Sequence, residues 1–277
     1  MWLDQYHPMA APIFNRFVVL GSMFGFSKGR VAPPSDKVPG VEILRPPAAI
    51  YAIGDIHGCL DKLKRLEAKI VEDAEAIVGD KLIITLGDYI DRGPSSAQTL
   101  NWLMRTPPHG FNRICLRGNH EAAFLAALEK PAACRDWLSW GGRETLSSYG
   151  IDPESFERLS GRERGQVLGA FVSEEQIAFL KSCPYYVSVP GFLFVHAGVR
   201  PGIPMPSQKA EDFMWIREPF LSKAHGLSAL VVHGHTPAIE PSITDYRIGI
   251  DTGAFDGGPL TALRVLANGE IAFLQAV

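Results

Sequence analysis

The stretch that decides the fold reads Leu82-Ile83-Ile84-Thr85-Leu86-Gly87-Asp88-Tyr89-Ile90-Asp91-Arg92-Gly93. Its first five residues form an apolar run with the length and composition of a buried strand. Gly87 then lets the backbone turn, and Asp88 lies just beyond the strand end, where open α/β sheets hold their ligands. Aspartate and glycine also occur in ordinary turns, so this stretch alone leaves a plain loop as an alternative.

Four further predicted strands end in the same kind of side chain. In chain order, the segments that follow them are Gly54-Asp55-Ile56-His57-Gly58, Arg117-Gly118-Asn119-His120-Glu121, His196-Ala197-Gly198 and His233-Gly234-His235. Carboxylate, amide and imidazole donors together suit Mn, Fe or Zn, whereas Mg prefers oxygen alone. This repetition favours a metal site over a series of ordinary turns.

In this order, the motifs resemble the phosphoprotein phosphatase family of calcineurin-like metallophosphoesterases, and most of all its compact bacterial serine/threonine branch. The match runs from about Tyr51 to Leu263. The resemblance implies an α/β fold, a calcineurin-like αββα sandwich in which helices flank two mixed β-sheets, here with a helical insert.

The resemblance also implies two divalent metal ions, with Mn expected and Fe or Zn as alternatives. The implied ligands are Asp55, His57 and Asp88 for one ion, and Asp88, Asn119, His196 and His235 for the other. Asn119 is in addition an expected substrate contact. A hydroxide that bridges the two ions would attack phosphorus in line, so no nucleophilic cysteine is expected.

Four side chains have expected catalytic roles. His120 is the expected general acid, and Asp91 would hold its ring. Arg92 and Arg217 would bind the phosphoryl oxygens as bidentate donors. For Arg217 a surface salt bridge to a neighbouring acid, Glu218 or Asp212, is the alternative. Asp251 is interpreted as structural, because it turns a strand near the metals.

Composition narrows the class of protein. The chain has 277 residues, of which 46% are hydrophobic and 21% charged, as is usual for a soluble globular enzyme. The net charge of −3 and the sequence pI near 6.2 offer no basic face for nucleic acid. The four cysteines are widely spaced, which favours buried thiols in a reducing compartment. We therefore expect a cytoplasmic enzyme that acts on a phosphorylated protein or a small phosphoester.

We divide the chain into an N-terminal extension with a Pro-rich linker, residues 1–47, and a single metallophosphoesterase domain, residues 48–277. The apolar run 17–26 is shorter than the roughly 20 residues of a membrane span, and Asp4 argues against a signal peptide. Residues 28–47 contain five prolines and no periodicity, which is typical of a linker. Met23 is an alternative start.

From residue 49 onward, strands and helices alternate. Helical spacing at 59–66 and 95–104 predicts a βαβαβ unit with a parallel sheet and right-handed crossovers. Residues 122–183 read as a helical insert. Its predicted helices are 121–128, 135–149 and 174–180, the last with a capping box from Ser173 and Gln176.

Within the insert, Trp137, Trp140 and Arg143 are candidates for shaping substrate access. The alternative that we favour is that the aromatic residues anchor the insert on the sheet.

The last part of the chain is rich in predicted strands. Residues 185–189 and 192–195 form a predicted hairpin around Pro190-Gly191. A second sheet is expected to be completed by four further strands, at 229–232, 246–251, 260–266 and 271–274. Asn268-Gly269 is the predicted turn between the last two.

Three hypotheses for the activity follow. Glu121 and the intact Asp91-Arg92 pair resemble serine/threonine protein phosphatases, which makes that activity the first choice. A symmetrical diadenosine tetraphosphate hydrolase is the alternative. A non-catalytic metal-binding module is disfavoured because His120, Asp91 and Arg92 are all present. The oligomeric state is left open.

Overall fold

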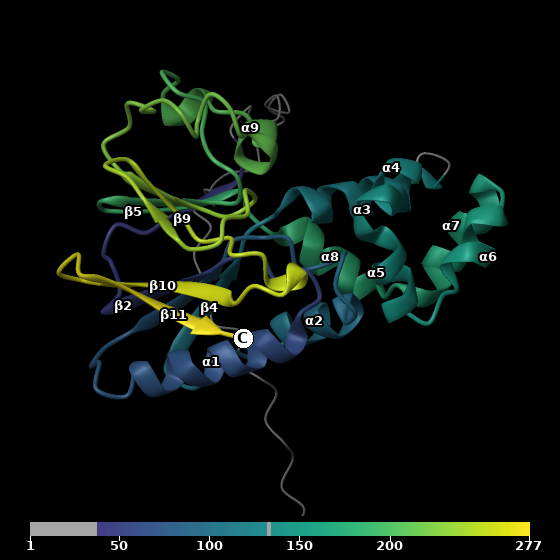
Figure 1. The fold of residues 1–277 in the computed structure, drawn as a ribbon, viewed down its shortest axis with the longest axis horizontal. Coiled ribbons are helices and arrows are strands. Elements are labelled where there is room, and N and C mark those ends of the chain that lie inside the picture. The colour runs from purple at the N-terminus through teal and green to yellow at the C-terminus, as the bar shows by residue number, and fades with distance from the viewer. Residues whose placement is uncertain (1–37, 132–133) are drawn as a thin grey trace, which may run out of the picture. The chain divides into compact units, whose positions relative to one another are not determined.

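The computed structural model describes residues 38–131 and 134–277. The predictions on residues 1–37 lie outside this part of the chain. Two mixed β-sheets stack face to face, and helices pack on the outer side of each (Figure 1). The predicted α/β sandwich is confirmed. None of the described helices is long and apolar enough to cross a membrane.

The first sheet has five strands. In spatial order they are β11 (Ile271–Ala276), β10 (Leu260–Leu266), β2 (Ala49–Ile53), β3 (Lys81–Thr85) and β4 (Phe111–Cys115). The strands β2, β3 and β4 run parallel, joined through α1 (Leu60–Asp73) and α2 (Ser96–Leu103). The predicted βαβαβ unit is therefore present. Because its strands are parallel, the loops at their carboxyl ends meet at one edge.

The second sheet has six strands. In spatial order they are β1 (Gly40–Glu42), β5 (Tyr186–Val189), β6 (Phe192–Val195), β7 (Leu230–His233), β9 (Arg247–Gly249) and β8 (Ser242–Ile243). The predicted hairpin of β5 and β6 is confirmed by their antiparallel register. On the outer face, α9 (Ala210–Trp215) packs through Phe213 against Leu193 and Val231. A short 3-10 turn, η3 (Met205–Ser207), precedes α9.

Alternation along β2 shows how the layers are built. Ile50 and Ala52 face the core between the sheets, where they meet Phe194 and Val232 of the second sheet. The intervening residues of β2 face the helices that cover the first sheet. Because both faces are covered, the strand is apolar throughout.

The segment between β4 and β5 is helical in its described residues. Its elements are α3 (Asn119–Glu129), α4 (Arg135–Trp137), the π-helical turn η2 (Leu138–Gly142), α5 (Arg143–Ser148), α6 (Pro153–Arg158), α7 (Gly161–Phe171) and α8 (Glu174–Ser182). Ser173 caps α8 as predicted, by accepting from the N–H of Gln176 at 3.2 Å. The predicted capping box is wrong, because the side-chain Oε1 of Gln176 accepts from the hydroxyl of Tyr149 and not from the N–H of Ser173.

Two predictions about the sheets are wrong. The final two strands, β10 and β11, do not complete the second sheet, since β10 pairs with β2 and adds both strands to the first. Their apolar pattern fits either sheet, so periodicity could not choose. The interpretation of residues 28–47 as a linker also fails in part, because β1 lies within this segment and pairs in parallel with β5.

Candidate metal centre

Five non-glycine residues of the described chain have a left-handed backbone, and all five belong to the predicted site. They are His57 (φ 42°), Asp88 (φ 50°), Asp91 (φ 70°), Arg92 (φ 67°) and His235 (φ 63°). Such conformations are uncommon for residues with a side chain and cost on the order of 1–3 kcal/mol each. Backbone strain that is concentrated in one cluster indicates that the directions of these side chains are needed for function.

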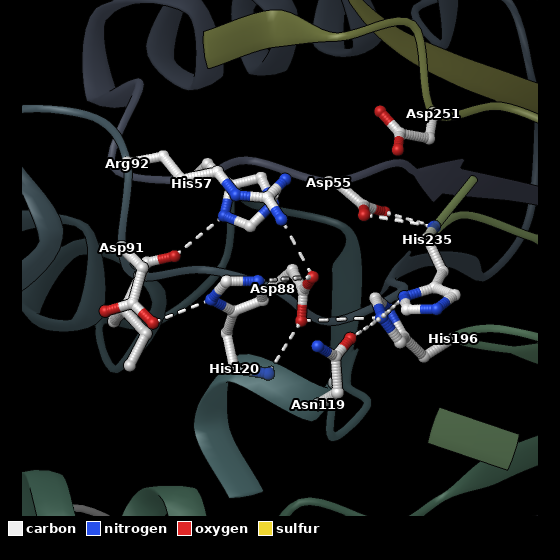
Figure 2. Close-up of polar contacts among 12 residues, drawn as sticks. Asp55, His57, Asp88, Asp91, Arg92, Asn119, His120, His196, His235 and Asp251 are labelled. Carbon is white, nitrogen blue, oxygen red and sulfur yellow. Dashed lines mark hydrogen bonds and ion pairs between the residues drawn. The ribbon is translucent and has the colours of Figure 1, made fainter. Parts of the chain in front are cut away.

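His57 occupies one side of the cluster around Asp88 (Figure 2). Its Nδ1 lies 2.8 Å from the carbonyl oxygen of Ile90, so the proton must be on Nδ1. Nε2 is therefore an acceptor, 3.5 Å from Oδ2 of Asp88 and 3.1 Å from a guanidinium nitrogen of Arg92. Burial lowers the pKa of His57 to about 3, which keeps the imidazole neutral.

His196 occupies the other side in the same manner. Its Nδ1 faces the carbonyl of Leu86 at 3.1 Å, so Nε2 presents a lone pair. Around Nε2 lie Oδ1 of Asn119 at 2.8 Å, Nδ1 of His235 at 3.2 Å and Oδ1 of Asp88 at 3.4 Å (Figure 2). Oxygen and nitrogen acceptors thus converge on a buried point.

The donor set fits divalent metal ions. His57, Asp88 and His120 form one group of ligand atoms within 4.8 Å of one another, and Asp88, His196 and His235 form a second. Nε2 of His196 and Oδ1 of Asn119 are two acceptors that face each other at 2.8 Å, an arrangement that a cation would satisfy. Ions bound here would polarise a phosphoryl group and lower the pKa of water.

Asp55 differs from its expected arrangement. Both carboxylate oxygens accept from the N–H of His235, at 3.0 and 3.2 Å, and Asp55 belongs to neither ligand group. Burial, followed by the charge of Asp251, raises the pKa of Asp55. Figure 2 shows these two carboxylates on the same side of the centre. A charge on Asp251 therefore disfavours a second charge on Asp55.

A sequence profile decides which family this centre belongs to. The profile described as calcineurin-like phosphoesterase matches residues 48–267. The chain belongs to the calcineurin-like phosphoesterase family. It is accordingly a metallophosphoesterase, as its motifs predict.

The proteins that are similar to this chain have names that indicate different activities. A Bacillus thuringiensis protein named bis(5'-nucleosyl)-tetraphosphatase PrpE [asymmetrical] is 26% identical over 236 residues, which cover 76% of this chain and 88% of the relative. A crystal structure presented as a candidate diadenosine tetraphosphatase superposes with a TM-score of 0.61, at 19% identity and covering 87% and 99% of the two chains. A Saccharomyces cerevisiae serine/threonine phosphatase similar to human PP5 has a TM-score of 0.53, at 15% identity and covering 87% and 84%. These two structures share the fold.

The phosphoesterase centre contains a histidine–carboxylate pair beside the ligands. Nδ1 of His120 lies 2.7 Å from Oδ2 of Asp91 (Figure 2). Burial alone lowers the pKa of His120, but the carboxylates of Asp88 and Asp91 outweigh it and the net pKa is raised. His120 is thereby able to hold a proton on both nitrogens, with its Nε2 3.8 Å from Asp88.

The helical insert supplies the partners of Asp91. The indole N–H of Trp137 lies 3.0 Å from both carboxylate oxygens, and the hydroxyl of Thr145 donates to Oδ1 at 2.6 Å. Trp137 also packs on Phe124 of α3, within the insert, so it combines packing with a direct contact to the centre. Thr145 carries no motif and was not predicted.

The two arginines lie at different ends of the centre. Arg92 contacts His57, and a guanidinium nitrogen of Arg217 lies 3.4 Å from the carbonyl oxygen of His235. The surface salt bridge raised as the alternative for Arg217 is absent from the described ion pairs, and Asp212 pairs with Arg200 instead.

Arg143, which the sequence offered as a candidate for substrate access, pairs with Glu157 within the insert.

Glu121 fixes the loops that carry the ligands. Its carboxylate accepts from the N–H groups of Asp88 and Tyr89, both at 2.8 Å, and of Gly118 at 3.0 Å. Gly118 has to be glycine because a Cβ there would lie 2.2 Å from Oδ1 of Asp88. The spacing from Gly118 to Glu121 is that of a capping box, a signal that could have revealed this role.

Proposed function

We propose that this metallophosphoesterase removes phosphate from phosphoserine and phosphothreonine in proteins. The observation that carries the proposal is the buried pair of His120 and Asp91, held at 2.7 Å. Asp91 is fixed by Trp137 and Thr145, so the imidazole of His120 has a defined direction. The contact between Nδ1 of His120 and the carboxylate of Asp91 favours the protonated ring that a general acid requires.

The leaving group explains why such an acid points to a phosphomonoester. A serine or threonine alkoxide is strongly basic and must gain a proton as its bond to phosphorus breaks. A nucleoside polyphosphate departs as a stable anion and gains little from protonation. General acid catalysis contributes roughly 10²–10⁴-fold where it is needed, so the pair suits the monoester reaction better.

The arginines complete the proposed substrate site. Arg92 beside His57 and Arg217 beside His235 would bind the phosphoryl oxygens from two directions. Asn119 would contact the same group. For the two metal ions we propose Mn, with Fe or Zn as alternatives, because the ligands mix imidazole nitrogen with oxygen.

Hydrolysis of dinucleoside polyphosphates is the second candidate. The name shared by relatives such as the Bacillus thuringiensis protein favours it, and that name specifies the asymmetrical reaction, whereas the sequence raised the symmetrical one. Two exposed indoles, Trp140 and Trp215, pack edge to face with centroids 5.3 Å apart. Because Trp215 also lies 6.4 Å from His235, these rings offer a stacking surface for a base.

One preparation loaded with Mn decides between the two. We expect kcat/KM for a phosphoserine or phosphothreonine peptide to exceed that for diadenosine tetraphosphate by at least about tenfold, or roughly 1.4 kcal/mol of transition-state binding. The reverse ranking would move the function to nucleotide hydrolysis. If the protein hydrolysed neither compound, the remaining candidates would be a small phosphoester as the substrate or a role in binding without catalysis.

A cytoplasmic location is also part of the proposal. All four cysteines lie in the described residues and none forms a disulfide, which supports a reducing compartment.

A further inference from the structure

The loop between β9 and β10 carries an aromatic side chain to the edge of the metal centre. It contains a single 3-10 turn, η4 (Ala254–Asp256), between Gly253 (φ 67°) and Gly257 (φ 85°). The N–H of Gly258 donates to the carbonyl of Gly253 at 3.0 Å. The left-handed glycines and this bond fold the loop back on itself, and Phe255 lies at its tip.

Phe255 contacts two side chains of the centre. Its ring stands edge-on to His57, with centroids 5.2 Å apart and planes at 80°. The guanidinium carbon of Arg92 lies 4.7 Å from the centroid of the same ring. Since Arg92 also donates to Nε2 of His57 at 3.1 Å, the three side chains form one stack. The face of an aromatic ring attracts a guanidinium electrostatically.

Arg92 depends on few other contacts for its position. None of the ion pairs in the described part of the chain involves Arg92, and its backbone N–H donates to the carbonyl of Gly141 at 3.1 Å. Gly141 (φ 111°) lies so close that a Cβ there would be 2.6 Å from the backbone nitrogen of Arg92. The backbone is therefore fixed by the insert, while the guanidinium is held by Phe255 and, where no metal ion takes the lone pair of Nε2, also by His57.

Lys62 holds the loop from the opposite direction. It lies in the first turn of α1, directly after the segment that carries His57. Its Nζ donates to the carbonyl of Ala254 at 3.0 Å and to that of Gly258 at 2.6 Å. These two carbonyls flank Phe255 along the chain. An ammonium group that binds both sides of the tip limits the movement of the ring between them.

We propose that Lys62 and Phe255 are positioning residues for Arg92. Lys62 fixes the loop, and the ring of Phe255 holds the guanidinium beside the ligand cluster, so that Arg92 is already directed toward a bound phosphoryl group. The inference rests on the proposed function in one respect, namely that Arg92 binds the phosphoryl oxygens. Holding an arginine in advance reduces the conformational freedom lost on binding and therefore improves affinity.

Two substitutions at Phe255 distinguish the effect of the aromatic ring from the effect of side-chain size. Phe255→Leu keeps an apolar side chain but removes the π face, whereas Phe255→Tyr keeps both. Phe273 on β11 is a matched control because both phenylalanines are 36% exposed. On the protein loaded with Mn, we expect Phe255→Leu to weaken binding of inorganic phosphate, measured by calorimetry, by about tenfold, with unchanged metal content. Phe255→Tyr and Phe273→Leu should bind phosphate like the wild type.

Lys62→Met gives a second route that leaves Phe255 in place. We expect it to weaken phosphate binding in the same direction, and Lys62→Arg to restore it. In an Arg92→Ala background, Phe255→Leu should have no further effect, because the group that it positions is gone. Three outcomes would overturn the inference. Phe255→Leu could weaken phosphate binding equally in the wild-type and Arg92→Ala backgrounds, it could lose metal, or it could bind phosphate as well as Phe273→Leu does. Phosphate binding is measured without turnover, so it tests the inference even if phosphopeptides prove not to be substrates.

Discussion

At the scale of single residues, Asp88 links the two halves of the centre. Its Oδ2 lies 3.5 Å from Nε2 of His57, and its Oδ1 lies 3.4 Å from Nε2 of His196. Its own backbone is left-handed and its N–H is bound by Glu121. One carboxylate thus faces ligand groups that come from distant parts of the sequence, and no other residue of the cluster does so.

We expect Asp88→Asn to abolish turnover and to lower the amount of bound metal, because the amide removes the negative charge that both groups of ligands share. Metal analysis of the purified protein and a phosphatase assay check this. Asp61→Asn, at an exposed position on α1, is the matched control. If Asp88→Asn retained two equivalents of Mn and normal activity, the assignment of the centre would be wrong.

His120→Asn tests the general acid. We expect it to slow an alkyl phosphate by roughly 10²–10⁴-fold and to slow an aryl phosphate, whose leaving oxygen is less basic, far less. Steady-state kinetics with both substrates measure the difference. Equal losses would indicate that His120 has a structural role or acts as a ligand, since it also lies in the group with His57 and Asp88.

Residues that directly follow a strand end are the ones that sequence reasoning could expect to lie together. Asp88, His196 and His235 meet because parallel strands bring their carboxyl ends together. The role of Thr145 could not be predicted from the sequence, because Thr145 belongs to no motif and lies 54 residues from its partner Asp91. The orientation of Asp55 depends likewise on the N–H of His235, which lies 180 residues away.

At the scale of elements, the helical insert supports catalysis from outside the sheets. Its helices α4 and α5 bring the indole of Trp137 and the hydroxyl of Thr145 to Asp91, so the insert orients the carboxylate that in turn orients His120. This explains why Trp137 is buried although the insert lies beside the sheets and not between them.

Trp137→Phe tests that dependence. The ring retains its packing against Phe124, but Asp91 loses an N–H donor, which costs about 1–3 kcal/mol in a buried site. We expect a lower kcat for alkyl phosphates and a smaller loss for aryl phosphates. Trp102→Phe on α2 is the matched control, because it removes an N–H donor to Glu67 away from the centre. It should lower thermal stability without changing the ratio of the two substrates.

Elements of the insert show why periodicity alone was insufficient. Helices α6 and α7 were not predicted because their hydrophobic faces are narrow, with Phe156 and Leu168 as their buried residues. Their start signals were nevertheless present. Asp152 precedes Pro153 and accepts from Ser155, and Ser160 forms a capping box with Glu163.

At the scale of the whole molecule, the N-terminal boundary can be tested by truncation. We expect deletion of residues 1–22 to leave turnover and the thermal midpoint unchanged, because that segment contains no residue of the site. Deletion of residues 1–47 should lower the midpoint, since it removes β1, whose residues pair with Tyr186 to Ser188. Thermal melts and phosphatase assays of both proteins give the test. A destabilised protein that lacks only residues 1–22 would contradict the prediction.

The exchange of strands between the sheets was the one large error in the fold. Each strand was recognised from its apolar run and its turn, and the register of β10 with β11 agrees with the predicted Asn268-Gly269 hairpin. Pairing partners far apart in sequence are chosen by the fit of both faces of the sandwich. The residues that determine this fit come from many elements, so no single stretch of sequence predicts which strands pair.

The position of β10 has a consequence for how the protein is made. Residues 49–53 at one end of the chain form an edge of the first sheet until residues 262–266 arrive to pair with them. A ribosome synthesises the chain from its N-terminus, so β2, β3 and β4 leave the exit tunnel long before that partner exists. Contacts of such large sequence separation form slowly, and an unpaired strand edge invites association with other chains. The nascent protein must therefore keep this edge of β2 covered until β10 has been synthesised.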